Sequence, residues 1–396
     1  MNSFIFHLLR KIVVLIVKLV TLFSRKVILF ESYPELDGSP WMIYLELQKR
    51  GYGKKYKLVW TVDSSFKAPS GVCSVPFFGR LSLWQKLKRF FYKASAKAIV
   101  DSNRYIYKAD DNTFRLYTRH GGTLKKVDQY SNSIGKIDCI LSLSDEMAEI
   151  EASLVYKDAG IDRKFFCPLG YPNNDELFNS LNPKLNVFWK KVTENQIQYD
   201  KIIGWMPTFR KHKFVGRTDS TKVYPFGIPL LYSIESFETV NEILKKKNIL
   251  LALKIHHSQM VDFPQISFSN IKIIPQDVQE KYSIPMMDLI KSFDALITDY
   301  SSIYHEYILL NRPVALAIDD FEEYSSKTGF AIDYFEWIKG VYLKDSSDLV
   351  HFIENVADGI DIAKAEREKT MHRIYKFIDN QSTKRVVDFL VENAKL

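Results

Sequence analysis

The 396-residue chain has few cysteines and no long uninterrupted apolar run. Its three cysteines, Cys73, Cys139 and Cys167, have no CxxC spacing, which argues against a disulfide framework or a structural zinc site and suits a reducing compartment. The apolar run Ile12–Val17 is interrupted by Lys18, whereas a spanning helix needs about 20 mostly apolar residues. No small-residue cleavage site follows, so a signal peptide is not indicated. Hydrophobic residues at 46% and charged residues at 26% exclude a disordered, collagen-like or polytopic membrane protein.

Several motifs of nucleotide and metal chemistry are also absent. The chain contains no GxxxxGK[ST] phosphate loop, no GxGxxG and no HExxH, and no two aspartates are spaced i, i+2. No residue pattern therefore requires a metal or another cofactor, and the sequence leaves a loosely bound Mg²⁺ open. Any phosphate must be held by cationic side chains, hydroxyls and backbone N–H groups.

Two stretches carry cations without any acid. Residues 1–30 are one of them, and the other lies between Asp63 and Asp101. Basic surfaces of this kind attract nucleic acid or anionic lipid. The N-terminal letters FIFHLLRKIVVLIVKLVTLF combine apolar residues with sparse cations, which favours lipid and excludes nucleic acid as the partner. We expect residues 1–25 to form an amphipathic membrane-associating helix, with a helix buried on the protein's own core as the alternative.

Residues 81–97 repeat this pattern within the second acid-free stretch. Trp84, Leu87 and Phe91 recur at helical spacing with cations between them. The pattern is equally compatible with a second membrane contact and with a core helix that has a solvated basic back.

Short apolar runs typical of buried strands alternate with helical patterns from Lys26 onward, which indicates βαβ units and parallel sheets. The expected strands cover residues 27–30, 58–61, 98–100, 114–117, 139–143, 202–205, 249–255, 271–274, 295–298 and 314–318. A polar stretch at 179–200 interrupts the alternation. We therefore predict an α/β fold with two Rossmann-like doubly wound domains that face a cleft, at residues 26–190 and 191–360, followed by a helical region at 361–396. Ligands of such folds bind at the carboxyl ends of the strands.

The sharpest candidate site is residues 296–303, with the letters LITDYSSI. An apolar strand ends at Thr298, and a helix pattern begins after Ser302. Hydroxyls at such a junction cap the helix and can contact an anion. One hydroxyl would suffice for a cap, but Thr298, Ser301 and Ser302 cluster here with Asp299, so we expect phosphate binding. Glu306 follows one turn later and could bond a ribose hydroxyl or lie on a solvated helix face.

Two further strands of the second domain end in polar groups. After residues 204–207 the chain delivers Thr208 and Arg210 to a loop, where the guanidinium can grip a phosphate bidentately. The strand at 249–255 ends with Lys254 and His256, which share a face by strand alternation. The alternatives are a surface turn with ordinary cations and a structural histidine.

In the first domain a strand ends at His120. Gly121 and Gly122 follow and allow close backbone approach, and Lys125 and Lys126 come next. Histidine is the natural base near neutral pH. Four strand ends with histidine, arginine, lysine or hydroxyl groups together predict a cationic site suited to phosphoryl transfer.

These motifs resemble those of the CDP-glycerol glycerophosphotransferases of teichoic acid and capsule synthesis. The resemblance covers roughly residues 26–340, and the matching segments, in chain order, are 120–126, 170–175, 207–210, 254–257 and 296–313. Three positions depart from the family pattern: Gly122 and Thr123 replace Thr-Pro, His257 replaces proline, and Asn173 stands where an arginine is usual. The resemblance implies a two-domain GT-B-like fold with the donor held mainly by the second domain, at the cytoplasmic face of the cell membrane.

We therefore expect an enzyme that transfers glycerol phosphate from CDP-glycerol to a hydroxyl of a lipid-linked glycan or a growing teichoic-acid or capsule polymer, with release of CMP. His120 is the expected general base, and His256, Arg210 and the hydroxyl cluster stabilise charge. Lys125, Lys126 and Gly121 are expected on the acceptor and phosphate side. The alternatives are a CDP-ribitol enzyme of the same family, a GT-B sugar-nucleotide glycosyltransferase, and a non-catalytic membrane adaptor.

Overall fold

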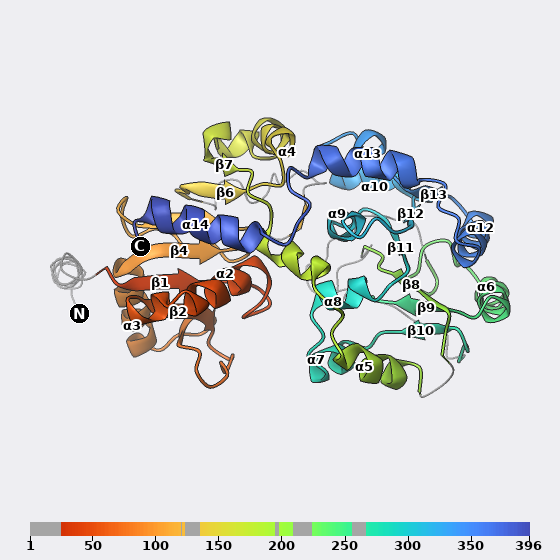
Figure 1. Ribbon diagram of the computed structural model, residues 1–396, viewed down its shortest axis with the longest axis horizontal. Coiled ribbons are helices and arrows are strands. Elements are labelled where there is room, and N and C mark those ends of the chain that lie inside the picture. Colours follow the sequence, from red (N-terminus) through yellow and green to blue (C-terminus); the bar gives the residue numbers. More distant parts are fainter. Residues whose placement is uncertain (1–24, 120, 123–134, 195–197, 209–223, 256–266) are drawn as a thin grey trace, which may run out of the picture. The chain divides into compact units, whose positions relative to one another are not determined.

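The computed structural model describes residues 25–119, 121–122, 135–194, 198–208, 224–255 and 267–396. The chain forms two compact units. The first comprises residues 1–120, 128–175 and 379–396, and the second comprises residues 121–127 and 176–378. Each unit is built on one parallel β-sheet (Figure 1).

The sheet of the first unit has the strand order β3-β2-β1-β4-β5-β6-β7, and every adjacent pair is parallel. Its strands are β1 (Val27–Phe30), β2 (Lys57–Asp63), β3 (Ser74–Phe78), β4 (Ala96–Asp101), β5 (Phe114–Tyr117), β6 (Cys139–Leu141) and β7 (Phe166–Cys167). This is the doubly wound order, in which the chain reverses direction across the sheet between β1 and β4. On the neighbouring strands β6 and β7, Cys139 and Cys167 pair as a disulfide with Cα atoms 6.1 Å apart, which the cysteine spacing did not predict.

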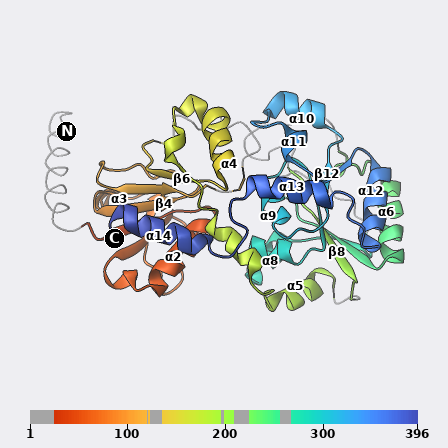
Figure 2. The same cartoon turned by 45° about the horizontal axis from the view of Figure 1, so that its top comes forward.

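Helices of the first unit come from both ends of the chain. They are α2 (Gly38–Lys49), α3 (Leu83–Ala94), α4 (Asp145–Ile150), which continues into a π-helical turn at Glu151–Val155, and α14 (Ser382–Ala394). Figures 1 and 2 show α14 lying along α2, where Arg50 forms an ion pair with Asp388. The Asp175 carboxylate accepts hydrogen bonds from the backbone N–H groups of Ser382 (2.9 Å) and Thr383 (2.7 Å), which satisfies the start of α14.

The sheet of the second unit has the order β10-β9-β8-β11-β12-β13, again entirely parallel. Its strands are β8 (Lys201–Trp205), β9 (Ile249–Leu253), β10 (Ile271–Ile273), β11 (Ala295–Thr298), β12 (Val314–Ala317) and β13 (Val341–Leu343). Its helices are α5 (Lys184–Val192), α6 (Ile234–Lys246), α7 (Gln276–Lys281), α8 (Met286–Lys291), α9 (Ile303–Ile308), α10 (Phe321–Thr328), α11 (Tyr334–Trp337), α12 (Ser346–Ala357) and α13 (Lys364–Ile374).

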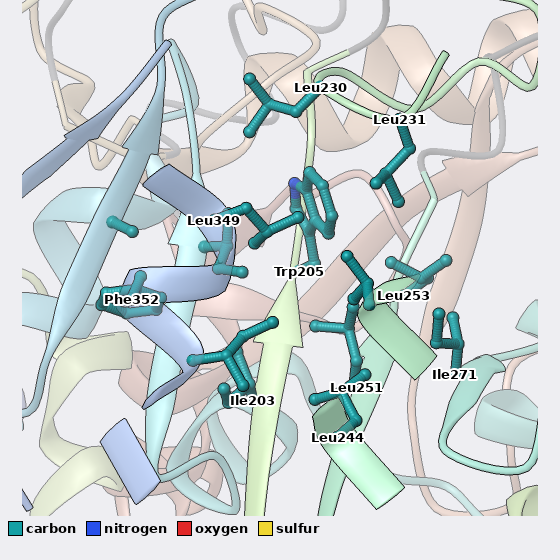
Figure 3. Packing of buried hydrophobic residues seen from close by; sticks show 14 of the residues in the cluster. Ile203, Trp205, Leu230, Leu231, Leu244, Leu251, Leu253, Ile271, Leu349 and Phe352 are labelled. Carbon is teal, nitrogen blue, oxygen red and sulfur yellow. The ribbon is translucent and has the colours of Figure 1, made fainter. Parts of the chain in front are cut away.

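A large apolar core covers one face of this second sheet. Trp205 of β8 is fully buried among side chains from β9, α6, α12 and the segment 228–231 (Figure 3). Strands that are buried on both faces read as continuous apolar runs, and β9 (ILLAL) is buried at every position.

The sequence pattern predicted the two parallel sheets and the central strands, but three short strands were missed. Strand β3 contains Pro76 and lies at a sheet edge, β7 has two residues, and β13 has three and lies at the other sheet's edge. The polar stretch 179–200 contains the helix α5. The C-terminal region, expected as one segment at 361–396, is divided: α13 belongs to the second unit and α14 to the first, and the units separate at residues 175/176 rather than near 190.

The expected N-terminal helix, residues 1–25, lies outside the described residues except for its last one. That residue, Arg25, forms an ion pair with Asp110 at 2.6 Å. Across the part of the chain that the structure describes, no helix combines the length and the apolar character that crossing a bilayer requires.

Gly204 in β8 tests how tightly the second unit is packed. A Cβ at this position would overlap the fully buried ring of Phe293. Gly204→Ala should therefore lower the free energy of unfolding by about 1–3 kcal/mol, the usual cost of overpacking a core, as measured by urea denaturation. Gly53→Ala is the matched control, because nothing lies within 4 Å of a Cβ there. Equal stability of the two variants would contradict this packing.

Candidate functional site

The second sheet reverses its strand order between β8 and β11, and this is where doubly wound folds bind ligands. Trp205, the last residue of β8, pairs with Ile297 of β11, and the Met206 N–H donates to the Ile297 carbonyl at 2.9 Å. The residues that follow each strand, Thr208 and Asp299, are therefore delivered to the same point at the carboxyl edge of the sheet. Both were predicted site residues.

The carboxylate of Asp299 ties these two strand ends together. The backbone N–H of Thr208 donates to both carboxylate oxygens (2.9 and 3.0 Å), and the Thr208 hydroxyl donates to one of them at 2.5 Å. Hydrogen bonds to an ionised acceptor are the strong ones. Asp299 and Thr208 thus position the segment that leads toward Arg210, which itself lies outside the described residues.

The predicted hydroxyl cluster separates into two groups. Thr298 is fully buried, and its hydroxyl donates to the Met206 carbonyl at 2.9 Å, so this side chain joins β11 to the end of β8. Ser301 and Ser302 are only partly buried. Thr298 is thus part of the buried framework, whereas the two serines lie at the partly exposed strand-to-helix junction.

Helix capping does not account for the two serines. Ser302 occupies the N-cap position of α9, yet its side chain makes no capping hydrogen bond. Within the described residues, neither serine hydroxyl has a hydrogen-bond partner. Because α9 has only six residues, the hydroxyls themselves, rather than a long helix dipole, are the groups that can contact an anion here.

A cluster of aromatic side chains packs against the Asp299–Ser302 loop and holds it by hydrogen bonds. The Tyr334 hydroxyl donates to the Asp299 carbonyl at 3.0 Å, and the Tyr300 hydroxyl donates to Asp320 at 2.9 Å. The Tyr300 ring stacks on Tyr324 with centroids 4.1 Å apart. Tyr300 lies within the predicted segment 296–303, whereas Asp320, Tyr324 and Tyr334 were not predicted, because they reach the loop through tertiary contacts that no local motif marks.

Glu306 is buried, with 5% of its surface exposed, so the alternative of a solvated helix face is wrong. Burial raises the pKa of its carboxyl from 4.5 to about 7. A carboxyl with such a pKa exchanges its proton near neutral pH, and it lies one turn beyond the two serines. Acids with perturbed pKa values are frequent in functional sites.

Lys254 follows β9, next to the end of β8, and its N–H donates to the Trp205 carbonyl at 2.9 Å. The side chain is 7% exposed, and its ammonium donates to the Gln276 amide oxygen at 2.5 Å. Burial lowers the pKa of Lys254 from 10.5 to about 8. His256, predicted on the same strand face, lies outside the described residues.

The two glycines of the first histidine motif belong to the second unit. A Cβ on Gly121 would approach the Ser302 hydroxyl oxygen to 2.5 Å, and one on Gly122 would overlap the His305 ring. The two glycines therefore lie against the side chains of Ser302 and His305, where a larger residue would not fit. His305 is 1% exposed and was not predicted, since nothing in its local sequence distinguishes it from a helix-core residue. Lys125 and Lys126 lie outside the described residues.

In the first unit, the chain before His120 is unusually constrained. Arg119 adopts a left-handed backbone conformation (φ 62°), which is rare for a non-glycine residue. Its buried guanidinium pairs with Glu151 in the π-helical turn and lies 5.4 Å from the centroid of the Tyr156 ring. π-Helical turns are frequent at functional sites. His120 itself lies outside the described residues.

The corresponding switch point of the first unit is filled by its own side chains. Glu31 after β1 is fully buried, and its carboxylate accepts from the backbone N–H groups of Ser102 (3.2 Å) and Asn103 (3.0 Å) and from Arg104 (3.1 Å). Burial raises the pKa of this acid. Within the part of the chain that the structure describes, the switch point of the second unit is the one that offers hydroxyls without a hydrogen-bond partner, on Ser301 and Ser302.

Glu306 predicts a specific pH dependence of stability. Its folded pKa of about 7 lies above the ordinary 4.5, so the unfolded state loses this proton first and stability falls as the pH rises through that window. Glu306→Gln abolishes this loss. Relative to the wild type, the variant should therefore gain about 3 kcal/mol of unfolding free energy between pH 4.5 and pH 7.5, as measured by denaturant titrations. The exposed Glu354→Gln is the control, and a pH-independent difference for Glu306→Gln would refute the buried acid.

Comparison with known proteins finds several similar chains. A teichoic acid poly(glycerol phosphate) polymerase of Bacillus spizizenii is 26% identical over 93% of this chain and 92% of that protein. A teichoic acid poly(ribitol-phosphate) polymerase of the same organism is 29% identical over 59% of this chain, and the match spans 34% of that protein.

A solved structure of the wall teichoic acid polymerase TagF superposes with a TM-score of 0.73 at 21% identity, covering 94% of this chain and 90% of that chain. This likeness shows a shared fold. The family model described as CDP-glycerol:poly(glycerophosphate) glycerophosphotransferase matches residues 13–392. Because that match spans nearly the whole chain, the protein belongs to the CDP-glycerol:poly(glycerophosphate) glycerophosphotransferase family.

Proposed function

We propose that this protein transfers glycerol phosphate from CDP-glycerol to a hydroxyl of a membrane-linked glycan or a teichoic-acid or capsule-type polymer, and releases CMP. The observation that carries the proposal is the family match over residues 13–392, together with the β8–β11 switch point, where the Ser301 and Ser302 hydroxyls have no hydrogen-bond partner among the described residues. The name of the glycerol phosphate polymerase relative supports the same donor.

The donor diphosphate is assigned to the second unit. Ser301 and Ser302 would donate hydroxyl hydrogen bonds to phosphate oxygens, and Arg210 would add a bidentate cationic contact. Asp299 and Thr208 would position these groups rather than contact the phosphate, because the hydrogen bonds between them fix the segment that precedes Arg210. Lys254, whose buried ammonium lies at the end of β9, contributes positive charge at the same sheet edge.

The reaction we propose is an in-line displacement at the phosphorus that carries glycerol. The acceptor oxygen forms a new bond to that phosphorus, the bond to the bridging oxygen breaks, and CMP leaves with the electron pair. His120 takes the hydroxyl proton as general base. His256 and Arg210 stabilise the charge on the transferring and leaving phosphates. No step requires a metal, and Mg²⁺ could assist by neutralising the diphosphate.

We assign the acceptor-binding residues and the location in the cell from the sequence. Gly121, Lys125 and Lys126 would serve the acceptor and phosphate side. Residues 1–25, apolar with sparse cations and no acid, would lie in the anionic interface at the cytoplasmic face of the cell membrane. That place would bring the enzyme to a lipid-linked acceptor.

A CDP-ribitol donor is the second candidate. It is favoured by the match to a teichoic acid poly(ribitol-phosphate) polymerase, which is as similar over its shorter aligned region as the glycerol phosphate relative. The two donors share the cytidine diphosphate and differ only in the alditol. The described residues that we assign to the diphosphate would therefore serve either donor.

The decisive assay measures CMP released from CDP-glycerol and CDP-ribitol with a soluble acceptor analogue. We expect CMP, rather than a nucleoside diphosphate, with CDP-glycerol preferred. His120→Ala should lower turnover about 10²–10⁴-fold, the usual contribution of a general base, while donor binding persists. The exposed His351→Ala is the control. Near-normal turnover of a folded His120→Ala protein would overturn the base assignment, and the absence of CMP with both donors would overturn the proposed function.

The serine assignment is tested by donor affinity. Ser302→Ala or Arg210→Ala should each weaken CDP-glycerol binding by about 1.5–3 kcal/mol in isothermal calorimetry, because each removes a charge-assisted phosphate contact. Ser346→Ala is the matched control: this exposed serine also begins a helix of the second unit, away from the crevice strands. Unchanged affinity in both crevice variants would mean that the diphosphate binds elsewhere.

A further inference from the structure

The two glycines that follow the predicted base His120 lie against the start of helix α9. The chain leaves the first unit at His120 and enters the second unit at Gly121. Gly121 lies beside the hydroxyl of Ser302, the N-cap residue of α9. Gly122 lies beside the ring of His305, three residues further along. Positions three apart share one side of a helix, so consecutive glycines contact a single face of α9.

The two glycines are required for different reasons. Gly121 has a φ of 70°, a left-handed conformation that favours glycine whatever lies nearby. Gly122 does not have a positive φ, so its backbone would accept a side chain. Space excludes one instead, because a Cβ on Gly122 would lie 2.4 Å from both Cγ and Nδ1 of His305. The glycine at this position is therefore explained by the His305 ring alone.

The His305 ring has little freedom to retreat from this contact. The residue is buried, with 1% of its surface exposed. Its carbonyl accepts a hydrogen bond from the Tyr375 hydroxyl at 2.8 Å, and the neighbouring Tyr304 hydroxyl donates to the Lys339 carbonyl at 3.0 Å. Because Cγ is the first ring atom, rotation of the ring about the Cβ–Cγ bond does not move it. Tertiary contacts thus hold α9, and α9 holds the ring.

We propose that His305 is a positioning residue for the base: its ring is the surface against which Gly122 rests, and this contact sets where the chain lies immediately after His120. The inference rests on the proposed function, in which His120 takes the acceptor proton. A base must lie within hydrogen-bond reach of the proton that it abstracts, so small displacements are costly. His305 acts through the backbone of Gly122 and touches no substrate.

A core histidine with no such role is the alternative, and kinetics separates the two. Loss of a core residue lowers stability, and any loss of activity then follows from the unfolded fraction. Loss of a positioning residue lowers kcat in the folded protein and leaves donor affinity unchanged, because proton transfer belongs to the transition state.

Gly122→Ala tightens the contact with the ring. Carbon atoms in ordinary contact are about 3.5–4.0 Å apart, so the added Cβ should displace the segment by roughly 1 Å. We expect kcat for CMP release to fall about 10²-fold, the usual cost of such a displacement. The calorimetric Kd for CDP-glycerol should stay within about twofold, since α9 itself is unchanged. Gly53→Ala, where a Cβ meets nothing within 4 Å, is the matched control and should keep the wild-type kcat.

Removal of the ring should reverse this effect. His305→Ala leaves only its Cβ, 2.9 Å from the added methyl group, so the double variant Gly122→Ala/His305→Ala should recover at least roughly tenfold in kcat over Gly122→Ala. The exposed His351→Ala, combined with Gly122→Ala in the same way, should recover nothing. His305→Ala alone leaves the segment without its support and should lower kcat on the order of tenfold. His305→Phe should regain most of that loss, because it restores a ring of similar size.

The outcomes distinguish this inference from the proposed function. Absence of CMP with the wild type overturns both. CMP release by the wild type, with equal kcat for Gly122→Ala and Gly53→Ala, overturns the role of His305 alone. So would a double variant without recovery, or a Kd for CDP-glycerol that rises in step with the fall in kcat. A loss in His305→Phe as large as that in His305→Ala would mean that the imidazole acts chemically, which also contradicts the proposal. If Gly122→Ala does not fold, this comparison of Phe with Ala decides the question.

Discussion

The Asp299 carboxylate joins two strand ends at the point where the second sheet reverses its order. Strands β8 and β11 are neighbours, and the hydrogen bonds from Thr208 to Asp299 join the two segments that follow them. The buried Asp299 carboxylate accepts hydrogen bonds from one backbone N–H and one hydroxyl, both of Thr208. These hydrogen bonds offset the cost of burying an acid at this position. Thr298 reinforces the junction through the Met206 carbonyl. The position of the serine loop follows from this junction.

Tertiary contacts hold the Asp299–Ser302 loop in place, and they distinguish it from an ordinary strand-to-helix turn. The Tyr334 hydroxyl donates to the Asp299 carbonyl, and the hydroxyl of Tyr300 in the loop donates to the Asp320 carboxylate. The glycine pair at 121–122 lies close enough that no side chain would fit. Positioning of this kind is what a phosphoryl-transfer site requires, because charged donors must meet the phosphate without reorganising. The buried Glu306 and Lys254 carry pKa values of about 7 and about 8, so both change charge near physiological pH.

Sequence patterns predicted the two parallel sheets because buried central strands, such as ILLAL at β9, are recognisable from composition alone. Edge strands such as β3 and β13 lack that signature. The return of α14 to the first unit was not predictable either, because it depends on hydrogen bonds from Ser382 and Thr383 to Asp175, more than two hundred residues earlier in the chain. The motif at 296–303 was identified correctly as a strand end with hydroxyls, yet sequence could not separate buried Thr298 from the accessible serines. The support from Tyr334 and Asp320 was also invisible, because it is formed by tertiary contacts alone. Periodicity also left two alternatives for residues 81–97, because it defines the apolar face of a helix but not what that face packs against. In the structure, Trp84, Leu87 and Phe91 of α3 are exposed rather than packed in the core.

The central claim is that the donor diphosphate binds at the β8–β11 switch point of the second unit. A crystal structure of the full chain soaked with CDP-glycerol tests it most directly. The account predicts density for the diphosphate within hydrogen-bond distance of the Ser301 and Ser302 hydroxyls, with Asp299 still bound to Thr208. Diphosphate density at the Glu31 switch point of the first unit, or anywhere away from the serine loop, would contradict it.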